Sequence, residues 1–256
     1  MRRLGGAIVA VMVLVACLSL FWTPYDPLQA DVTARLQASS LAHPMGTDQF
    51  GRDIASRVMD GARLTLATAL GATAISALVG VPLGVLAGMR RGASRFVMAG
   101  ADLLLAFPAL LLAIVLTAVF GASMWIVVLA IGIAGIPGFV RVARAGTLTV
   151  MQADFIAAAR IARVPGPKIA ARHVLPNIWP LVATQVSVAL SLAILAEAGL
   201  SFLGLGAPAP YASWGRMLQA SQPYLATAPH LALWPGAAIA LTVLGFNLLG
   251  SAHDRR

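Results

Sequence analysis

Three charged residues with the spacing of a catalytic or cation-binding site lie close together at Asp48, Arg52 and Asp53. Two carboxylates beside an arginine are able to hold a cation or to exchange protons with a substrate. The nearby glycines, Gly46 and Gly51, indicate tight turns, in which such carboxylates cap helices or form surface salt bridges. We favour this structural interpretation, and we predict neither a metal site nor a catalytic residue here.

The other candidates for chemistry are sparse. The four histidines are scattered along the chain, and the single lysine, Lys168, lies in the sequence Gly-Pro-Lys-Ile. A phosphate-binding loop needs a glycine-rich turn ending in Gly-Lys-Ser/Thr, and a zinc-protease helix needs His-Glu-x-x-His. The sequence contains neither pattern, and its single cysteine, Cys17, excludes a multi-cysteine metal site. We predict a non-catalytic chain that binds no ATP, cofactor or metal of its own.

The composition is that of an integral membrane protein. Hydrophobic residues make up 59% of the 256 residues and charged residues 11%, against roughly 25% charged residues in soluble domains. The net charge of +9 raises the possibility of a nucleic-acid partner, but the basic residues adjoin apolar runs and form no patch with interleaved aromatic residues. The lipid bilayer is therefore the expected surroundings, and nucleic acid is not an expected partner.

The uncharged runs predict an all-α fold with six transmembrane helices. A spanning helix needs about 20 apolar residues, and we place the spans at 4–22, 64–89, 97–119, 124–142, 178–196 and 231–249. The uncharged run 103–140 is too long for one span, so we expect a turn at 121–123. Pro108 and Pro137 predict kinks in the two helices that flank this turn. The first run also fits a signal peptide, but its apolar continuation past Cys17 favours a span.

These spans define the expected organisation of the chain. Residues 1–22 form an N-terminal transmembrane helix, 23–63 a periplasmic or external loop, 64–250 a core of five spans, and 251–256 a tail. Thirteen of the 18 basic residues lie in the termini, the turn at 90–95 and the segment 141–172, and five lie in the opposite loops. Because basic residues gather on the cytoplasmic side, both termini and the loop 143–177 are predicted to be cytoplasmic. A cysteine at Ala207 should then be accessible from outside, and one at Ala162 only from inside.

The segment 151–177 is the longest basic insert between two apolar runs. Residues 153–163 favour a helix because Asp154 suits the first turn and alanines follow, whereas Val-Pro-Gly-Pro at 164–167 stops it. Small side chains on one face of this helix permit close approach by a partner. We therefore interpret the segment as a cytoplasmic docking element.

Four sequence motifs resemble those of one family of membrane proteins. Residues 157–159 together with 172–177 resemble the EAA loop of bacterial ABC importer permeases. Residues 43–53, 198–206 and 246–250 resemble the GTDxxGRD, LSFLGLG and closing motifs of the dipeptide/oligopeptide/nickel group. Together the motifs extend over nearly the whole chain.

The resemblance implies a permease subunit of the bacterial inner membrane with a type I importer core. Such a subunit forms half of a translocation path with a second, homologous permease, as a heterodimer. Its other partners are two cytoplasmic ATPase subunits or domains, which carry ATP and magnesium, and an extracytoplasmic substrate-binding protein. The implied substrates are di- or oligopeptides, with nickel or a metal chelate as the alternative.

The EAA-like segment is then the expected site of coupling to the ATPases. The residues that the resemblance assigns to this role are Asp154, Phe155, Ala157, Ala158, Ala159, Arg160 and Arg163. The segment departs from the family pattern twice, because Ala157 replaces a glutamate and Arg163 replaces a glycine. A glycine there ends the helix by adopting φ > 0, so we expect this helix to run slightly longer.

Two charges lie within membrane-like sequence, Asp102 and Glu197, and both are close to a predicted membrane surface. We favour a structural role for them over contact with a substrate. The candidates for an outer gate or pathway are Glu197, Ser201, Phe202 and Leu203, although 201–206 also fits a tight turn between helices. A self-sufficient channel or secondary carrier is the alternative class. It calls for polar or ionisable residues at mid-span, and we expect none in these spans apart from Asp102 and Glu197 near the membrane surfaces.

Overall fold

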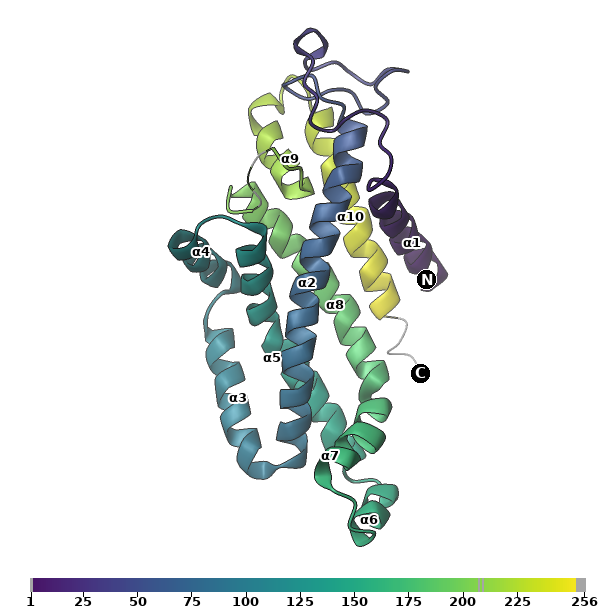
Figure 1. The fold of residues 1–256 in the computed structure, drawn as a ribbon, viewed down its shortest axis with the longest axis vertical. Helices are drawn as coiled ribbons and strands as arrows, with labels where there is room; N and C mark the ends of the chain where they lie inside the picture. The colour runs from purple at the N-terminus through teal and green to yellow at the C-terminus, as the bar shows by residue number, and fades with distance from the viewer. Residues whose placement is uncertain (1, 207, 209, 252–256) are drawn as a thin grey trace.

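The computed structural model describes residues 2–206, 208 and 210–251. This part is helical apart from turns and one isolated β-bridge, so the predicted all-α fold is confirmed (Figure 1). The predicted tail beyond residue 251 and the position of Ala207 lie outside the described residues. The long helices are α1 (Arg2–Leu18), α2 (Ile54–Met89), α3 (Arg91–Ala106), α4 (Ala109–Phe120), α5 (Met124–Val150), α8 (Leu175–Phe202) and α10 (His230–Gly250). The short ones are η1 (Val32–Ala34), α6 (Asp154–Ile161), α7 (Gly166–Ile169), the π-helical η2 (Ala170–Val174), α9 (Trp214–Ser221) and η3 (Gln222–Tyr224).

Four helical stretches in the described residues are long and apolar enough to cross a membrane, namely α2, α5, the run α7–η2–α8 and α10. α3 and α4 add a fifth only if they are counted together. α1 has 17 residues, which is about 26 Å of helix against a hydrocarbon core of about 30 Å. The predicted span 4–22 extends four residues past the end of α1 at Leu18. The chain turns there, and the Ser19 hydroxyl donates to the Ala16 carbonyl (2.8 Å). By length and composition, the described residues give four or five full spans and one short apolar helix, and the predicted number of six is not reached by full spans alone.

The predicted kinked span 97–119 is two helices in the structure. α3 and α4 meet at an angle of 81°. Pro108 causes the break, since it lacks an amide hydrogen and disfavours a helical backbone at Phe107, which is extended (φ −91°, ψ 121°). Pro137, in contrast, lies inside the continuous α5. The predicted turn at 121–123 is confirmed, because α4 ends at Phe120 with Gly121 as its cap residue, and Ser123 caps α5.

The pair formed by α2 and α5 is in backbone contact. A Cβ atom added to Gly84 of α2 would lie 2.5 Å from the Val140 carbonyl oxygen and 2.7 Å from the Ala143 Cβ atom. Small residues allow this close approach, which favours packing of helices in a membrane. α2 also extends ten residues beyond the predicted span 64–89, because Asp53 caps it at Ile54.

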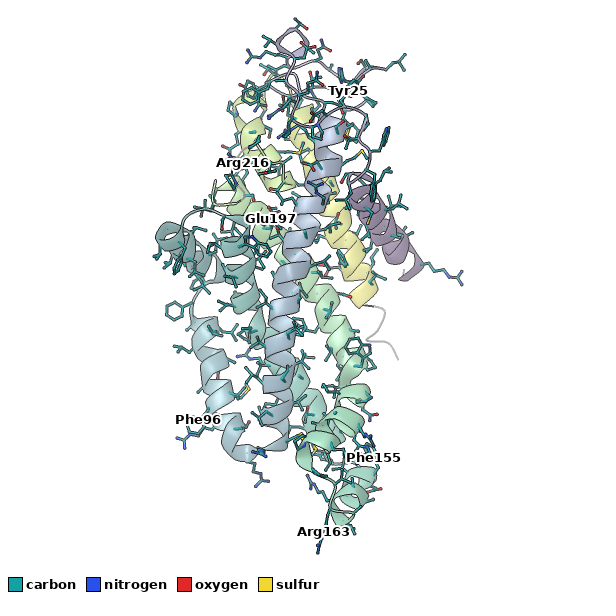
Figure 2. The ribbon with its side chains drawn as sticks, in the orientation of Figure 1. Tyr25, Phe96, Phe155, Arg163, Glu197 and Arg216 are labelled. Atoms are coloured by element: carbon teal, nitrogen blue, oxygen red, sulfur yellow. The ribbon has the colours of Figure 1, made fainter. Side chains whose placement is uncertain are left out.

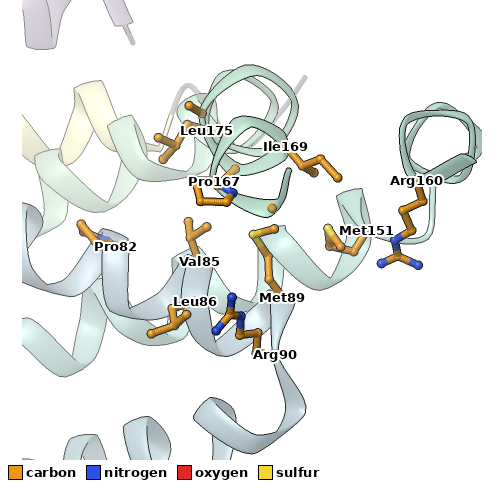
Figure 3. A pocket seen from close by; sticks show the side chains of 13 residues that line it. Pro82, Val85, Leu86, Met89, Arg90, Met151, Arg160, Pro167, Ile169 and Leu175 are labelled. Carbon is orange, nitrogen blue, oxygen red and sulfur yellow. The ribbon is translucent and has the colours of Figure 1, made fainter. Parts of the chain in front are cut away.

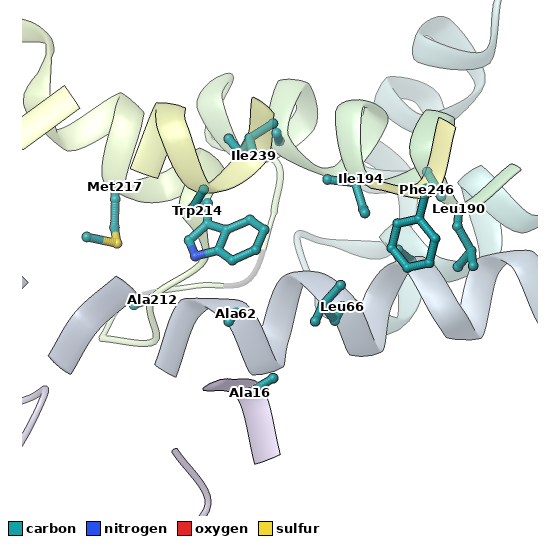
Figure 4. Packing of buried hydrophobic residues seen from close by; sticks show 14 of the residues in the cluster. Ala16, Ala62, Leu66, Leu190, Ile194, Ala212, Trp214, Met217, Ile239 and Phe246 are labelled. Carbon is teal, nitrogen blue, oxygen red and sulfur yellow. The ribbon is translucent and has the colours of Figure 1, made fainter. Parts of the chain in front are cut away.

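A separate apolar core joins α2 to α8, α9 and α10 (Figure 4). Trp214 at the start of α9 is fully buried there, and its indole N–H donates to the Val58 carbonyl of α2 (2.9 Å). α1 packs alongside α10, with the Cβ position of Gly5 2.8 Å from the Gly245 carbonyl oxygen. The beginning of α1 thus lies beside the last turns of α10 (Figure 1).

Candidate functional site

The predicted docking element forms a projection at one end of the molecule, which we call the α6 knob (residues 151–169). Figure 2 places Phe155 and Arg163 there, at the opposite end from Tyr25. Ile156 of α6 is fully buried and packs in one cluster with Ile169 and the start of α8. This apolar contact packs α6 against α7, η2 and the start of the spanning helix α8.

Six of the seven predicted coupling residues are exposed on the knob: Asp154, Phe155, Ala157, Ala158, Arg160 and Arg163. Ala159 differs, because it is buried in the same cluster as Ile156 and supports α6 from inside. Ile161 is 85% exposed although it is apolar. No sequence pattern singled out Ile161, and its exposure makes it a further candidate for contact with a partner.

α6 ends at Ile161 and is therefore shorter than the predicted helix 153–163. Arg163 follows the cap residue, Ala162, in the left-handed conformation with φ +53°. Its amide donates to the Arg160 carbonyl (2.9 Å), and the Val164 amide donates to the Ala159 carbonyl (3.0 Å). These two hydrogen bonds make a Schellman motif. The expectation of a longer helix is wrong, because the motif imposes the glycine-like backbone on Arg163 at a cost of about 1–2 kcal/mol.

The end of α8 shows the same motif with the usual residue. Gly204 has φ +83°, its amide donates to the Ser201 carbonyl (3.0 Å), and the Leu205 amide donates to the Leu200 carbonyl (2.9 Å). The same motif therefore holds an unstrained glycine, Gly204, after α8 and a strained arginine, Arg163, after α6. Strained residues of this kind concentrate at functional sites, which makes the side chain of Arg163 a candidate for contact with a partner.

The predicted gate residues divide into a buried pair and an exposed pair. The Glu197 carboxylate is 3% exposed and accepts hydrogen bonds from the Ser201 hydroxyl (2.6 Å) and, across the helix interface, from the Thr65 hydroxyl of α2 (3.1 Å). The Ser213 hydroxyl also faces this carboxylate. Phe202 and Leu203 are exposed at the end of α8. Glu197 therefore ties α8 to α2 and to the segment before α9, near the end of the molecule that carries Arg216 (Figure 2).

The other charge within membrane-like sequence, Asp102, also links two helices. Its carboxylate lies 2.7 Å from the Arg141 guanidinium, so that α3 is joined to α5. Both side chains are more than half exposed, and an exposed pair of this kind stabilises a fold only slightly.

The carboxylates of the loop 23–53 act as caps and ion-pair partners, as predicted. Asp53 accepts from the Ser56 amide at the start of α2 (2.8 Å), and its other oxygen lies 3.0 Å from His43 Nδ1. Asp48 pairs with Arg52 (2.7 Å) and with Arg57 (3.5 Å). The prediction that these pairs lie on the surface is wrong, because Asp48, Asp53 and Arg57 are each less than 10% exposed. In the described residues no group of three possible ligands could hold a metal ion.

A cavity of about 470 Å³ lies between α2, α5 and α8, and Leu105 of α3 and Leu110 of α4 also line it. Its wall is mostly apolar, with neutral polar groups from Thr73, Ser76 and Gln185. The Thr73 hydroxyl is buried without a hydrogen-bond partner, which is a costly state that a bound polar group would relieve. Gln185 lies against Gly138 of α5.

The expectation that the spans hold no polar residue at mid-span is wrong, because it considered ionisable side chains and overlooked these neutral polar ones. The available signal was Gln185, an amide in the middle of a charge-free run. Polar groups buried inside a membrane bundle mark pathways or binding sites often enough to count as a functional hypothesis.

Comparisons with known proteins agree with this arrangement. Residues 80–255 match the family "Binding-protein-dependent transport system inner membrane component". The chain is 39% identical to the glutathione transport system permease protein GsiD of Pectobacterium atrosepticum, over 96% of this chain and 82% of the relative. It is 37% identical to the dipeptide transport system permease protein DppC of Alkalihalophilus pseudofirmus, over 96% of this chain and 81% of the relative.

The fold also matches a solved structure, an inward-facing conformation of the MetNI methionine ABC transporter. The TM-score is 0.63 at 18% identity, over 77% of this chain and 93% of the solved one. The predicted type I importer core is thereby confirmed at the level of the fold. The chain belongs to the family of inner membrane components of binding-protein-dependent transport systems.

Proposed function

We propose that this chain is the permease subunit of an ATP-driven importer and forms half of a translocation path for di- or oligopeptides. The observation that carries the proposal is the α6 knob, a projection with exposed Phe155, Arg160 and Arg163 that is packed onto a spanning helix. Movement of an attached ATPase would shift α8 through this contact and so change access to the path.

The substrate class is supported by two observations. The relatives named above are described as permeases for glutathione and dipeptides, and another, from Escherichia coli, as a probable D,D-dipeptide permease (38% identity, 96% of this chain, 83% of the relative). The α2–α5–α8 cavity offers apolar walls for side chains and the neutral groups of Thr73 and Gln185 for peptide amides. Nickel, the alternative substrate, has no comparable support.

The proposed assembly follows from the family. A second, homologous permease would complete the path as a heterodimer, and two ATPase subunits or domains with ATP and magnesium would bind the knob. An extracytoplasmic binding protein would deliver the substrate to the end that carries α9 and the loop 23–53. This chain is then a non-catalytic subunit of the bacterial inner membrane.

Reconstitution tests this function. The purified chain alone is expected to hydrolyse no ATP and to transport nothing. With its partner permease, ATPases and binding protein in proteoliposomes, it should take up labelled dipeptides only when ATP is present. Uptake by the lone chain without ATP would indicate a carrier or channel, and uptake of ⁶³Ni²⁺ but not of peptides would identify the alternative substrate.

The orientation can be tested by cysteine labelling. We propose that the termini and the knob are cytoplasmic, because the basic residues gather at that side. In a Cys17→Ser background, Ala226→Cys beyond η3 should react with an impermeant maleimide in spheroplasts. Ala162→Cys on the knob should react only after permeabilisation. Both positions are exposed. Ala162 directly follows α6 and Ala226 lies between α9 and α10, and Figure 1 shows α6 and α9 toward opposite ends of the molecule, so the reverse pattern would overturn the orientation.

A further inference from the structure

A second cavity, of about 510 Å³, lies between the end of α2 and the α6 knob (Figure 3). Its wall is largely apolar and includes Val85 and Met89 of α2, Met151 after α5, and Leu175 at the start of α8. Two arginines also line it, Arg90 at the end of α2 and Arg160 on α6. In Figure 3 the two methionines lie between the two arginines.

Neither arginine is neutralised within the chain. Arg90 and Arg160 are both exposed, and in the described residues neither forms a salt bridge with a carboxylate. The cavity lining contains no acidic residue. Two guanidinium groups beside an apolar cavity favour a ligand that combines an anionic group, above all a phosphate, with an apolar chain.

The cavity lies where the membrane-like sequence ends. Arg90 is the first charge after the uncharged run 64–89, and Leu175 follows closely after the last charge before α8. Trp179, one turn further along α8, is 65% exposed, and exposed tryptophans are enriched at the level of the lipid headgroups. This pattern indicates that the apolar wall lies at the edge of the hydrocarbon region and that Arg90 lies in the headgroup region.

We propose that this cavity binds one anionic phospholipid, with its phosphate at Arg90, an acyl chain against Met89 and Met151, and Arg160 at the opposite rim of the cavity. The proposed orientation of the chain enters only in assigning the lipid to the cytoplasmic leaflet, where anionic lipids attract basic segments. The lipid would bridge α2 and the α6 knob. An acidic segment of a partner protein matches the charge but leaves the apolar wall at this depth unfilled.

Native mass spectrometry of the purified chain tests the proposal. Mixed micelles containing equal amounts of phosphatidylglycerol and phosphatidylcholine should leave phosphatidylglycerol bound preferentially. Arg90→Gln should weaken phosphatidylglycerol binding about fivefold, the equivalent of one basic residue at a membrane surface. Arg90→Lys should retain part of the binding, and the neighbouring Arg91→Gln, outside the cavity, should leave it unchanged.

A second variant tests the acyl-chain part of the cavity. Ala171 is exposed and lines the cavity, so Ala171→Phe should fill it and reduce retention of the lipid without altering its charge. Glycerol phosphate, which lacks acyl chains, should not compete. Equal retention of the two lipids, or equal binding by Arg90→Gln and Arg91→Gln, would overturn the proposal. Because no ATPase is present, this outcome is independent of whether the transport function is correct.

Discussion

The double variant Arg160→Glu/Arg163→Glu is expected to lose substrate-stimulated ATP hydrolysis and uptake while it still inserts and pairs with its partner permease. Both arginines are exposed on the α6 knob, in which Asp154 is the one acidic residue beside Arg160, Arg163 and Lys168. The charges that this helix presents near an ATPase are therefore mainly positive. Reversing a charge that faces an opposite one across an interface replaces attraction by repulsion, which we estimate to weaken coupling about tenfold per residue.

Two single variants at Arg163 separate its charge from its backbone. Arg163→Glu removes the cation and keeps a side chain in the left-handed conformation. Arg163→Gly also removes the cation, but it relieves a strain of about 1–2 kcal/mol and should stabilise the end of α6. If the charge binds the ATPase, both variants lose coupling. If the shape of the helix end is what matters, Arg163→Gly matches or exceeds the wild type.

The control variant reverses a charge at the same end of the molecule as the α6 knob. Arg95→Glu reverses an exposed charge on α3 that belongs to neither the knob nor the cavities, and it should leave coupling unchanged. Coupling is measured as binding-protein-stimulated ATPase activity together with peptide uptake, after insertion has been verified. Wild-type coupling in the double variant would show that these arginines act only as topology signals.

The outcome at Arg163 also shows where sequence reasoning succeeds. The alanine-rich pattern and the Val-Pro-Gly-Pro stop located α6 correctly, because both depend on local propensity. The end of the helix was misplaced because we treated φ > 0 as a property of glycine. In the structure, the hydrogen bonds of Arg163 and Val164 to the previous turn decide the backbone, whatever the residue.

The transmembrane helices likewise show features that the sequence predicts and features that it does not. Hydrophobic runs predicted α10 almost to the residue, since both of its ends coincide with a change to polar sequence. The 81° bend at Pro108 was not predictable as an angle, because a proline in an apolar run fits either a kink or a break. Likewise, burial of Glu197 depends on α2 and α9, which are far away in the sequence, so the sequence left open whether it anchors a helix or lines a gate.

Glu197→Ala is expected to destabilise the permease by about 2–5 kcal/mol, because two or three hydroxyl groups would lose their acceptor in a buried site. Ser201 and Thr65 are both fully buried, so neither hydroxyl is open to bulk water. Thr65 is also the acceptor for the Trp214 amide (3.4 Å). Loss of Glu197 should therefore loosen the contact between α8, α2 and the start of α9.

A graded series makes this prediction specific. Ser201→Ala removes one donor and keeps the carboxylate, so its effect should be about 1 kcal/mol. Glu197→Gln keeps the volume and an acceptor oxygen, and the hydroxyls can rotate to accept from its amide, so it should lie between Ser201→Ala and Glu197→Ala. Tryptophan fluorescence during thermal unfolding in detergent is a suitable measurement, since Trp214 is fully buried in this region.

The same series decides between an anchor and a gate. An anchoring Glu197 predicts that unfolding temperature and uptake decline together through the series, with Glu197→Ala lowest in both. A gate or substrate contact predicts that Glu197→Ala unfolds at the wild-type temperature but takes up peptide poorly. Because the carboxylate is only 3% exposed and its oxygens are already engaged by hydroxyls of two helices, the parallel decline is the expected result, and wild-type stability would refute it.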